Sequence, residues 1–336
     1  MRYLLNILFS IIILLLIFYL IDVNTLVNVL VNVNLFYVAL AIFFYIILNI
    51  LMSLRIKVIL DGLGNEVPLK ETIISSFTGM LASDFTPARS GYFFTAFDLS
   101  SRLKLPLENT MISIFGPQLL EFTIKSLCVG ILAVFVLSQF EIFEDQSIYI
   151  ILSAALIFLV VLFFGMLLFS KGFLKKFSFI KKLPLGGKFF SLFHMMQANS
   201  GVLLKKKYQI IGLTLGSWFL KTCEWFCLAK SLNISLFDPV LEFLFIGVFQ
   251  ASVTLIHFMP IPTIAGMGTS EAAFGVILLL FGVPIETGVA FGLLTRGLMI
   301  FVDFIFGVGN LSVYIRREKI KGILDDIQDV ERRAEA

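Results

Sequence analysis

The sequence has few of the residues from which metal sites and water-soluble surfaces are built. Only 15% of its 336 residues are charged, and it contains two histidines and three cysteines. His194 and His257 lie far apart in the chain, and Cys128, Cys223 and Cys227 all lie in apolar stretches. No spacing typical of metal ligands is therefore present in the sequence. We expect a protein without a metal site and without a cofactor.

The residues that are abundant are the apolar ones. They make up 59% of the chain, phenylalanine alone occurs 38 times, and the mean hydropathy is +0.99. These values exceed those of typical soluble domains and predict an all-α polytopic membrane protein. A stretch of about 18 or more apolar residues is long enough to cross a bilayer as a helix. Six stretches meet this length, namely residues 4–21, 35–54, 110–137, 148–169, 208–228 and 289–315.

The first of these stretches could also be read as a signal peptide. Residues 4–21 are longer than a typical apolar signal region, and no small-x-small cleavage site follows them. We therefore expect a retained first helix.

The positions of lysine and arginine orient the six spans, because short basic loops remain in the cytoplasm. The loops before the first span and after the second are basic, whereas the loop between them, residues 22–34, has no basic residue. The loops near residues 138–147 and 231–239 also lack basic residues, and the chain after the last span is basic again. This alternation predicts a cell-membrane protein with both termini in the cytoplasm.

Two polar segments lie outside the expected spans. Residues 171–207 contain nine lysines and no acidic residue, which predicts a cytoplasmic loop. This loop is either an ordinary connection or a segment that lies on the anionic inner leaflet, where each basic residue contributes roughly 1 kcal/mol of attraction. Residues 316–336 predict a short cytoplasmic tail helix. Residues 1–315 would then form a single integral membrane domain.

Two apolar regions are interrupted by proline and glycine. Residues 71–101 break at Pro87 and Gly91, and residues 239–283 break at a run that includes Gly266 and Gly268. The pieces beside each break are too short to span a bilayer, so we expect two re-entrant helical hairpins. Irregular backbone at membrane depth is tolerated only where protein or a watery cavity surrounds it. Both breaks should therefore face inward.

The two interrupted regions precede similar sequences. At a shift of 178 residues, residues 103–116 align with residues 281–294, so that Pro106 meets Pro284 and Glu108 meets Glu286. We interpret residues 35–138 and 208–315 as the halves of an inverted repeat. Such repeats with broken helices are a recurring architecture of secondary transporters.

Charged residues inside the expected spans are candidates for a functional site, because each costs roughly 2.5 to 3.5 kcal/mol at the bilayer centre on insertion scales. Helical spacing allows Glu121 to pair with Lys125 and likewise allows Lys221 to pair with Glu224. These pairs are either functional or simple packing pairs.

Other charged residues have no such local partner. Arg296 and Asp303 lie seven residues apart with no oppositely charged residue within four positions, so we expect partners on other helices. Asp84 and Arg89 flank the first break, and Glu271 follows the second. Glu271 could be only a carboxylate that stabilises a helix start. The alternatives are that Arg296 pairs with it or that its carboxyl carries a proton during a transport cycle.

Taken in order along the chain, these segments resemble the flippase-like membrane domain of lysylphosphatidylglycerol synthases and its stand-alone bacterial and archaeal relatives. The resemblance covers most of the chain. Members usually carry a carboxylate where this chain has Tyr92 and an arginine where it has Gln118. The motifs are "SLRIKVIL" with Arg55, "PARSGYFFTAFDLSSRLKLPL" with Arg89 and Gly91, the stretch from Gln118 to Glu121, "PIPTIAGMGTSEAA" with Glu271, and "LLTRGLM" with Arg296.

This resemblance implies a lipid transporter rather than an enzyme. It would move a charged phospholipid or a lipid-linked sugar between leaflets, with membrane lipids and not nucleic acid as partners. The soluble aminoacyl-transfer domain is not among these residues, so lipid aminoacylation is not implied. The residues expected along the path are Arg55, Asp84, Arg89, Gly91, Gln118, Glu121, Lys125, Gly266, Gly268, Glu271, Arg296 and Asp303.

Two other functions remain open at this point. An ion-coupled secondary transporter of a small solute would share the expected architecture. An intramembrane lipid-modifying enzyme is less favoured, because the sequence offers neither a supported nucleophile nor a metal site.

Overall fold

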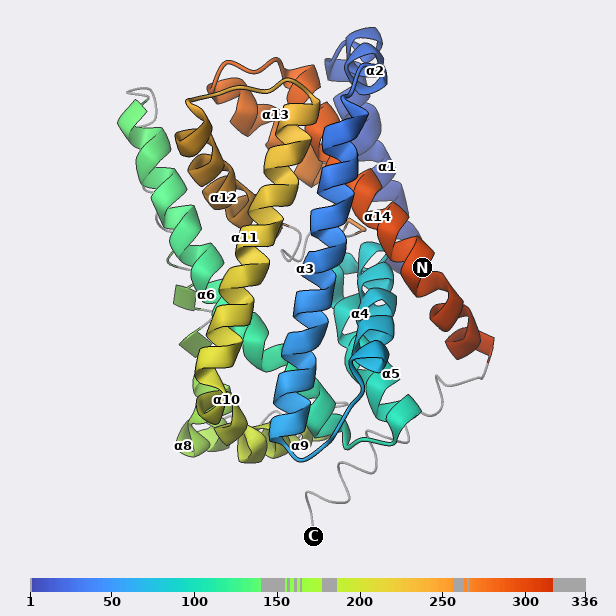
Figure 1. Cartoon of the computed structure of the whole chain (residues 1–336), viewed down its shortest axis with the longest axis vertical. Helices are drawn as coiled ribbons and strands as arrows, with labels where there is room; N and C mark the ends of the chain where they lie inside the picture. The colour runs from blue at the N-terminus through green and yellow to red at the C-terminus, as the bar shows by residue number, and fades with distance from the viewer. Residues whose placement is uncertain are drawn as a thin grey trace. The chain divides into compact units, whose positions relative to one another are not determined.

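The computed structural model describes residues 2–139, 155, 158–159, 162–163, 165–176, 186–256, 263–264 and 266–316. Throughout these ranges the regular secondary structure is helical (Figure 1). The first half contains α1 (Arg2–Leu20), α2 (Val23–Val31), α3 (Leu35–Gly62), α4 (Leu69–Asp84), the 3-10 helix η1 (Pro87–Phe93), α5 (Phe94–Leu103) and α6 (Leu107–Gln139). Then follow α8 (Lys171–Lys176), α9 (Gly186–Asn199), α10 (Gly201–Lys205), α11 (Lys207–Ser231), α12 (Pro239–Ile256), α13 (Thr269–Leu280) and α14 (Ile285–Arg316).

The chain forms two compact units that alternate along the sequence. Unit 1 comprises Met1–Asn49, Met80–Tyr92 and Gly216–Phe306, and unit 2 comprises Ile50–Gly79, Phe93–Leu215 and Gly307–Ala336. Helices α3, α4, α11 and α14 therefore contribute residues to both units.

Three helices of the described chain are long and apolar enough to cross a membrane. They are Leu35–Gly62, Leu107–Leu132 and Ile285–Leu311, and they confirm three of the six expected spans. A fourth results if Leu8–Leu20 and Val23–Val31, which meet at a bend of 96°, count as one span. The expected span at residues 208–228 is the 25-residue helix α11, but polar side chains such as Lys221 and Glu224 lower its hydropathy. The expected span at residues 148–169 lies largely outside the described residues.

Short helices flank both of the expected breaks. In the first region α4 ends at Asp84, and η1 and α5 follow. In the second region α12 ends at Ile256 and α13 begins at Thr269. Gly266 and Gly268 precede α13 with φ angles of 76° and 85°, which favour glycine because a Cβ atom is strained there. The re-entrant course of these segments stays a prediction, and Pro260 and Pro262 lie outside the described residues.

The loops before α6 and α14 have the same backbone geometry. Lys104 and Gly282, which are 178 residues apart, both have a left-handed conformation, with φ angles of 54° and 82°. Leu105 N donates to Ser100 O, and Val283 N donates to Leu278 O, each at 3.1 Å. After each loop the carbonyl of the proline accepts the first helical hydrogen bonds, from Asn109 and Thr110 in one case and from Thr287 and Gly288 in the other. The alignment found in the sequence thus has a local structural counterpart, while the inverted relation of the two halves stays a prediction.

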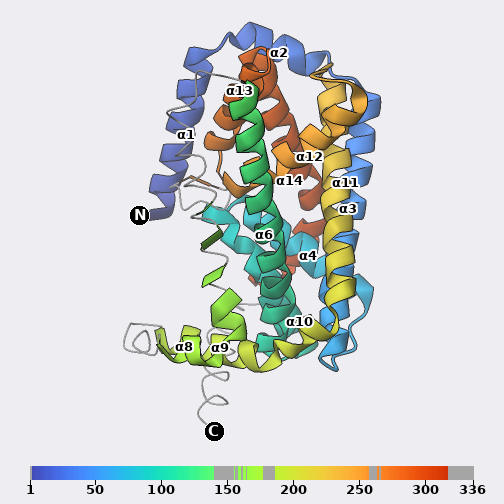
Figure 2. The ribbon, with the colours of Figure 1, turned by 90° about the vertical axis from the view of Figure 1, so that its left-hand side faces the viewer.

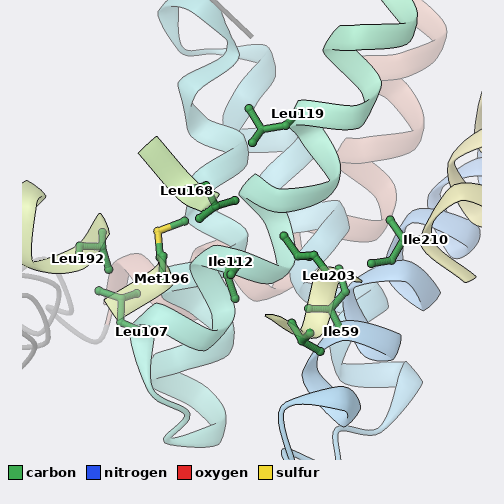
Figure 3. Close-up of a cluster of buried hydrophobic side chains, with 10 residues drawn as sticks. Ile59, Leu107, Ile112, Leu119, Leu168, Leu192, Met196, Leu203 and Ile210 are labelled. Atoms are coloured by element: carbon green, nitrogen blue, oxygen red, sulfur yellow. The ribbon is translucent and has the colours of Figure 1, made fainter. Parts of the chain in front are cut away.

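The core of unit 2 forms where the lysine-rich segment meets the beginning of α6. Helix α9 lies across this part of α6 (Figure 2). Its Leu192 and Met196 belong to one buried cluster with Leu107 and Ile112 of α6 (Figure 3). The described part of the expected basic loop is therefore helical and covers apolar side chains of its own unit.

The core of unit 1 is aromatic and joins four helices, two of which, α13 and α14, carry part of the candidate site. Trp225 of α11 lies 5.9, 5.1 and 5.6 Å from the ring centroids of Phe249, Phe274 and Phe291, which belong to α12, α13 and α14. All four side chains are almost fully buried. Large aromatic contacts of this kind fix the helices relative to one another.

Candidate functional site

Unit 1 contains a small polar cavity at the first break and beside the start of α13. Its volume is about 20 Å³, which suffices for about one water molecule. A lipid headgroup does not fit into it in this conformation. The cavity is lined by Asp84, Arg89, Ser270, Glu271, Phe274, Gly292, Thr295, Arg296 and Met299.

An ion pair between α13 and α14 forms one side of this cavity. Arg296 Nε lies 2.6 Å from Glu271 Oε1, and Arg296 Nη2 donates to Ser270 Oγ at 2.8 Å. Glu271 Oε2 accepts from the backbone N of Gly268 at 2.7 Å and from Ser270 Oγ at 2.9 Å. Glu271 is therefore both the cap of α13 and the counter-ion of Arg296. The expected pairing of these two residues is confirmed.

Glycines bring α13 and α14 close enough for this pair to form. A Cβ atom on Gly288 would lie 2.8 Å from the Cα of Gly275 and 2.9 Å from the carbonyl oxygen of Phe274. A Cβ atom on Gly292 would lie 2.7 Å from the Phe274 ring and 3.2 Å from the Cα of Glu271. Small residues allow such close backbone contact between membrane helices. The sequence around Glu271 and Arg296 thus folds into a tightly packed helix pair.

A second ion pair forms the opposite part of the cavity wall. Arg89 Nη2 lies 3.0 Å from Asp84 Oδ1 and 3.2 Å from Ser83 Oγ. Arg89 also has a φ angle of 51°, which a residue with a Cβ atom seldom adopts. Strained backbone of this kind persists where its surroundings hold it, and it is frequent at binding sites. Gly91 allows the chain to pass close to α4, because a Cβ there would lie 2.4 Å from the backbone of Ala82.

More polar side chains lie beside the cavity within unit 1. Lys221 Nζ contacts both carboxylate oxygens of Glu224 at 2.9 and 3.0 Å, which confirms the pair expected from helical spacing. The same ammonium lies 3.7 Å from the sulfur of Met299, a residue of the cavity wall. The Tyr45 hydroxyl donates to Asp303 Oδ2 at 2.8 Å. Asp303 thus has a contact on another helix, as expected, although the sequence did not identify Tyr45.

Three of the expected path residues form a separate cluster in unit 2. Glu121 Oε1 lies 2.5 Å from Arg55 Nη1, and its other oxygen lies 3.6 Å from Lys125 Nζ. Arg55 Nη1 also donates to Thr214 Oγ1 at 3.0 Å. Gln118, on the preceding turn of α6, is buried. This cluster belongs to unit 2, whereas the cavity belongs to unit 1.

The structure therefore divides the residues that the sequence singled out. Asp84, Arg89, Glu271 and Arg296 line the cavity, and Gly268 holds Glu271 in place. Gly266 supports the same turn, because its carbonyl accepts from Ser270 N and from the hydroxyls of Thr269 and Ser270.

Sequence reasoning missed several side chains of the two units. Ser270 and Thr295 line the cavity, and their adjacency to Glu271 and Arg296 was the available signal. It also missed a network in unit 2, where Arg102 contacts Glu71 and Asp98 and donates to Asn310. All four of these residues flank or lie in segments expected to be membrane-embedded, and that position could have drawn attention to them.

Comparison with known proteins gives one match. No curated protein and no solved structure matches the chain. Residues 3–307 match the family described as "Lysylphosphatidylglycerol synthase TM region". That match covers most of the chain, including both breaks, the cavity residues and the cluster of unit 2. The chain belongs to the lysylphosphatidylglycerol synthase TM region family.

Proposed function

We propose that this chain is a flippase-like transporter that moves a charged phospholipid or a lipid-linked sugar between the two leaflets of the cell membrane. Two kinds of observation support the proposal. The family is a membrane domain of enzymes named for a phospholipid product, and unit 1 places two arginines at one small cavity. The cavity carries most weight, because it gives the transported headgroup a place to bind.

The chemistry of the cavity suits an anionic headgroup. A guanidinium group presents a planar set of donors that matches the oxygens of a phosphate. Arg89 and Arg296 are each neutralised by a carboxylate, Asp84 and Glu271, at 3.0 and 2.6 Å. An incoming phosphate would exchange with these carboxylates, so that no arginine would have to stay buried without an anion. The carboxylates would then release the headgroup by competing for the arginines again.

The size of the cavity defines which state of the transporter this conformation represents. A volume of about 20 Å³ holds about one water molecule, so the headgroup can enter only after the walls separate. One wall is built from α4 and η1, and the other from α13 and α14. We assign the conformation to a closed state. In the proposed cycle, inverted halves with cytoplasmic termini would open the site to each leaflet in turn.

The test compares two buried ion pairs of unit 1 that have the same separation. The double variant Glu271→Gln/Arg296→Gln removes the pair at the cavity without leaving a single buried charge. The control Lys230→Gln/Glu242→Gln removes the pair between α11 and α12, which has the same separation of 2.6 Å and does not line the cavity. Each variant is reconstituted into vesicles that contain a fluorescent anionic phospholipid, and the amount that changes leaflet is measured.

We expect the cavity variant to lose lipid translocation and the control to retain it, with both proteins folded. Full translocation by Glu271→Gln/Arg296→Gln would refute the assignment of this site. Stabilisation of the protein by a water-soluble solute in the absence of lipid would favour the solute transporter instead. Chemical turnover of the headgroup would favour the lipid-modifying enzyme.

A further inference from the structure

Two buried aspartates of unit 1 lie against each other. Asp84 lines the cavity together with Met299, which lies one helical turn before Asp303, and the carboxyl groups of the two aspartates interact electrostatically. Each has one oxygen with a donor, because Asp84 Oδ1 accepts from Arg89 and Asp303 Oδ2 accepts from Tyr45. The remaining oxygens, Asp84 Oδ2 and Asp303 Oδ1, are buried and receive no hydrogen bond from the part of the chain that the structure describes. Two ionised carboxylates offer only acceptors, so a hydrogen bond between them requires a proton.

The balance of charge around these two aspartates also favours one bound proton. Three cations of the group each have a carboxylate of their own, in the pairs Arg89–Asp84, Lys221–Glu224 and Arg296–Glu271. Asp303 is the fourth carboxylate and is 0% exposed, and within the described residues it accepts a hydrogen bond from the neutral hydroxyl of Tyr45. A buried charge that is not compensated is costly and tends to be neutralised. The groups that face the two aspartates are Tyr45 on α3, Arg89 on η1, Lys221 on α11 and Arg296 on α14.

We propose that Asp84 and Asp303 share one proton, which is bound to Asp303 Oδ1 and donated to Asp84 Oδ2, and that this proton is transported together with the lipid. The second part of this inference rests on the proposed function. The carboxyl pair of aspartic proteases shares a proton for the same reason, because like charges in contact are not both ionised.

The link to transport is Asp84, which belongs both to the carboxyl pair and to the cavity wall. When the proton is bound, the pair carries one negative charge, and Arg89 is available to a phosphate in the cavity. When the proton leaves, two carboxylates compete for Arg89 and repel an anionic headgroup. Proton and headgroup therefore bind with positive coupling. The transported lipid should move in the same direction as the proton.

The first experiment examines the proton itself, independently of transport. Infrared spectra of the purified full-length chain near neutral pH should show the carbonyl stretch of a protonated carboxylic acid, which shifts in D₂O. We expect Asp303→Asn to lose this band and Asp22→Asn to keep it. Asp22 is a suitable control because it is an exposed aspartate at the start of α2. Absence of the band in the wild type, or its persistence in Asp303→Asn, would overturn the shared proton.

A second variant keeps the test valid if Asp303→Asn does not fold. Tyr45→Phe keeps both carboxyl groups and removes only the hydroxyl that donates to Asp303. The infrared band should remain and change its frequency, because the hydrogen bonding of the carboxyl has changed. A band that does not move would contradict the arrangement.

The second experiment measures the coupling in vesicles that contain a fluorescent anionic phospholipid. If one proton moves with each lipid, a gradient of about one pH unit shifts the distribution between leaflets by up to about tenfold. We expect this shift in the wild type and none in Asp303→Asn. Translocation that ignores the proton gradient, or that follows a sodium gradient instead, would overturn the coupling and leave the proposed function intact. Absence of translocation under every gradient would overturn the proposed function and the coupling, while the infrared band would still decide whether the pair holds a proton.

Discussion

Replacement of Glu271 by glutamine should destabilise the protein by about 3 kcal/mol, because it removes the carboxylate that neutralises Arg296. Removal of one partner from a buried ion pair typically costs about 3 to 5 kcal/mol. The lower end applies here, since the Arg296 side chain is 14% exposed and keeps its hydrogen bond to Ser270. Glutamine also retains an oxygen that can accept from the backbone N of Gly268. The loss therefore measures the charge and not the helix cap.

Two further variants separate the contributions of charge and cap. Glu271→Ala removes both, and the missing helix cap should add about 1 kcal/mol to the loss. The double variant Glu271→Gln/Arg296→Gln should cost less than the sum of its two single variants, with an interaction energy of about 2 kcal/mol. Each variant isolates one contact that the structure gives to Glu271.

The assay is reversible unfolding in mixed micelles, followed by the fluorescence of Trp225, which packs on the same helices. Trp218 is the second tryptophan and is replaced by phenylalanine in all proteins compared. A cost below about 1 kcal/mol for Glu271→Gln would match an exposed pair and refute the buried one. Strict additivity in the double variant would show that Glu271 and Arg296 do not interact.

Two other predictions concern the turn before α13 and the cluster of unit 2. Gly268→Ala should lower the stability of the fold more than Gly64→Ala does. Both glycines have φ angles near 80°, so an alanine at either position is strained by about 1 to 2 kcal/mol. Only at Gly268 would the new Cβ also clash with another residue, since it would lie 2.6 Å from Ile13. Thermal unfolding of both variants measures the difference, and equal losses would contradict the contact with Ile13. Arg55→Gln should cost about 3 kcal/mol, because Glu121 would lose its closest cation. Arg55→Lys should lower the free energy of unfolding less than Arg55→Gln does, because lysine keeps the positive charge. Equal losses of both variants in chemical unfolding would contradict a stabilising role of that charge.

The sequence predicted local contacts well and contacts between helices only in part. The pair of Lys221 and Glu224 was predicted because residues three positions apart lie on the same face of a helix. The same rule paired Glu121 with Lys125, but the shorter contact of Glu121 is to Arg55, from another helix. Spacing along one helix carries no information on which helix packs beside it. Glu271 was named as a possible partner of Arg296 for a different reason, because a carboxylate beside an anionic headgroup would repel it unless the carboxylate were paired or protonated.

The expected spans show a similar limit. Hydropathy correctly predicted the helices at residues 35–54, 110–137 and 289–315, because each contains a long apolar run. Hydropathy alone does not give the angle of 96° between the first helix and α2, although the spacing of Asn24, Asn28 and Asn32 predicts a separate short interfacial helix there. Tyr45 was also missed, because a tyrosine in an apolar run has the same effect on hydropathy whether or not its hydroxyl binds a carboxylate.

The glycine contacts between α13 and α14 also have a mechanical consequence. Gly275 and Gly288 bring the two backbones so close that neither helix can slide past the other without a steric clash. In the proposed transport cycle, the two helices should therefore move together and carry Glu271 and Arg296 with them. In that cycle the cavity would widen through movement of the wall that contains Asp84 and Arg89. Arg89 is held in a strained conformation with a φ angle of 51°, so a movement of this wall that changes that angle would release strain.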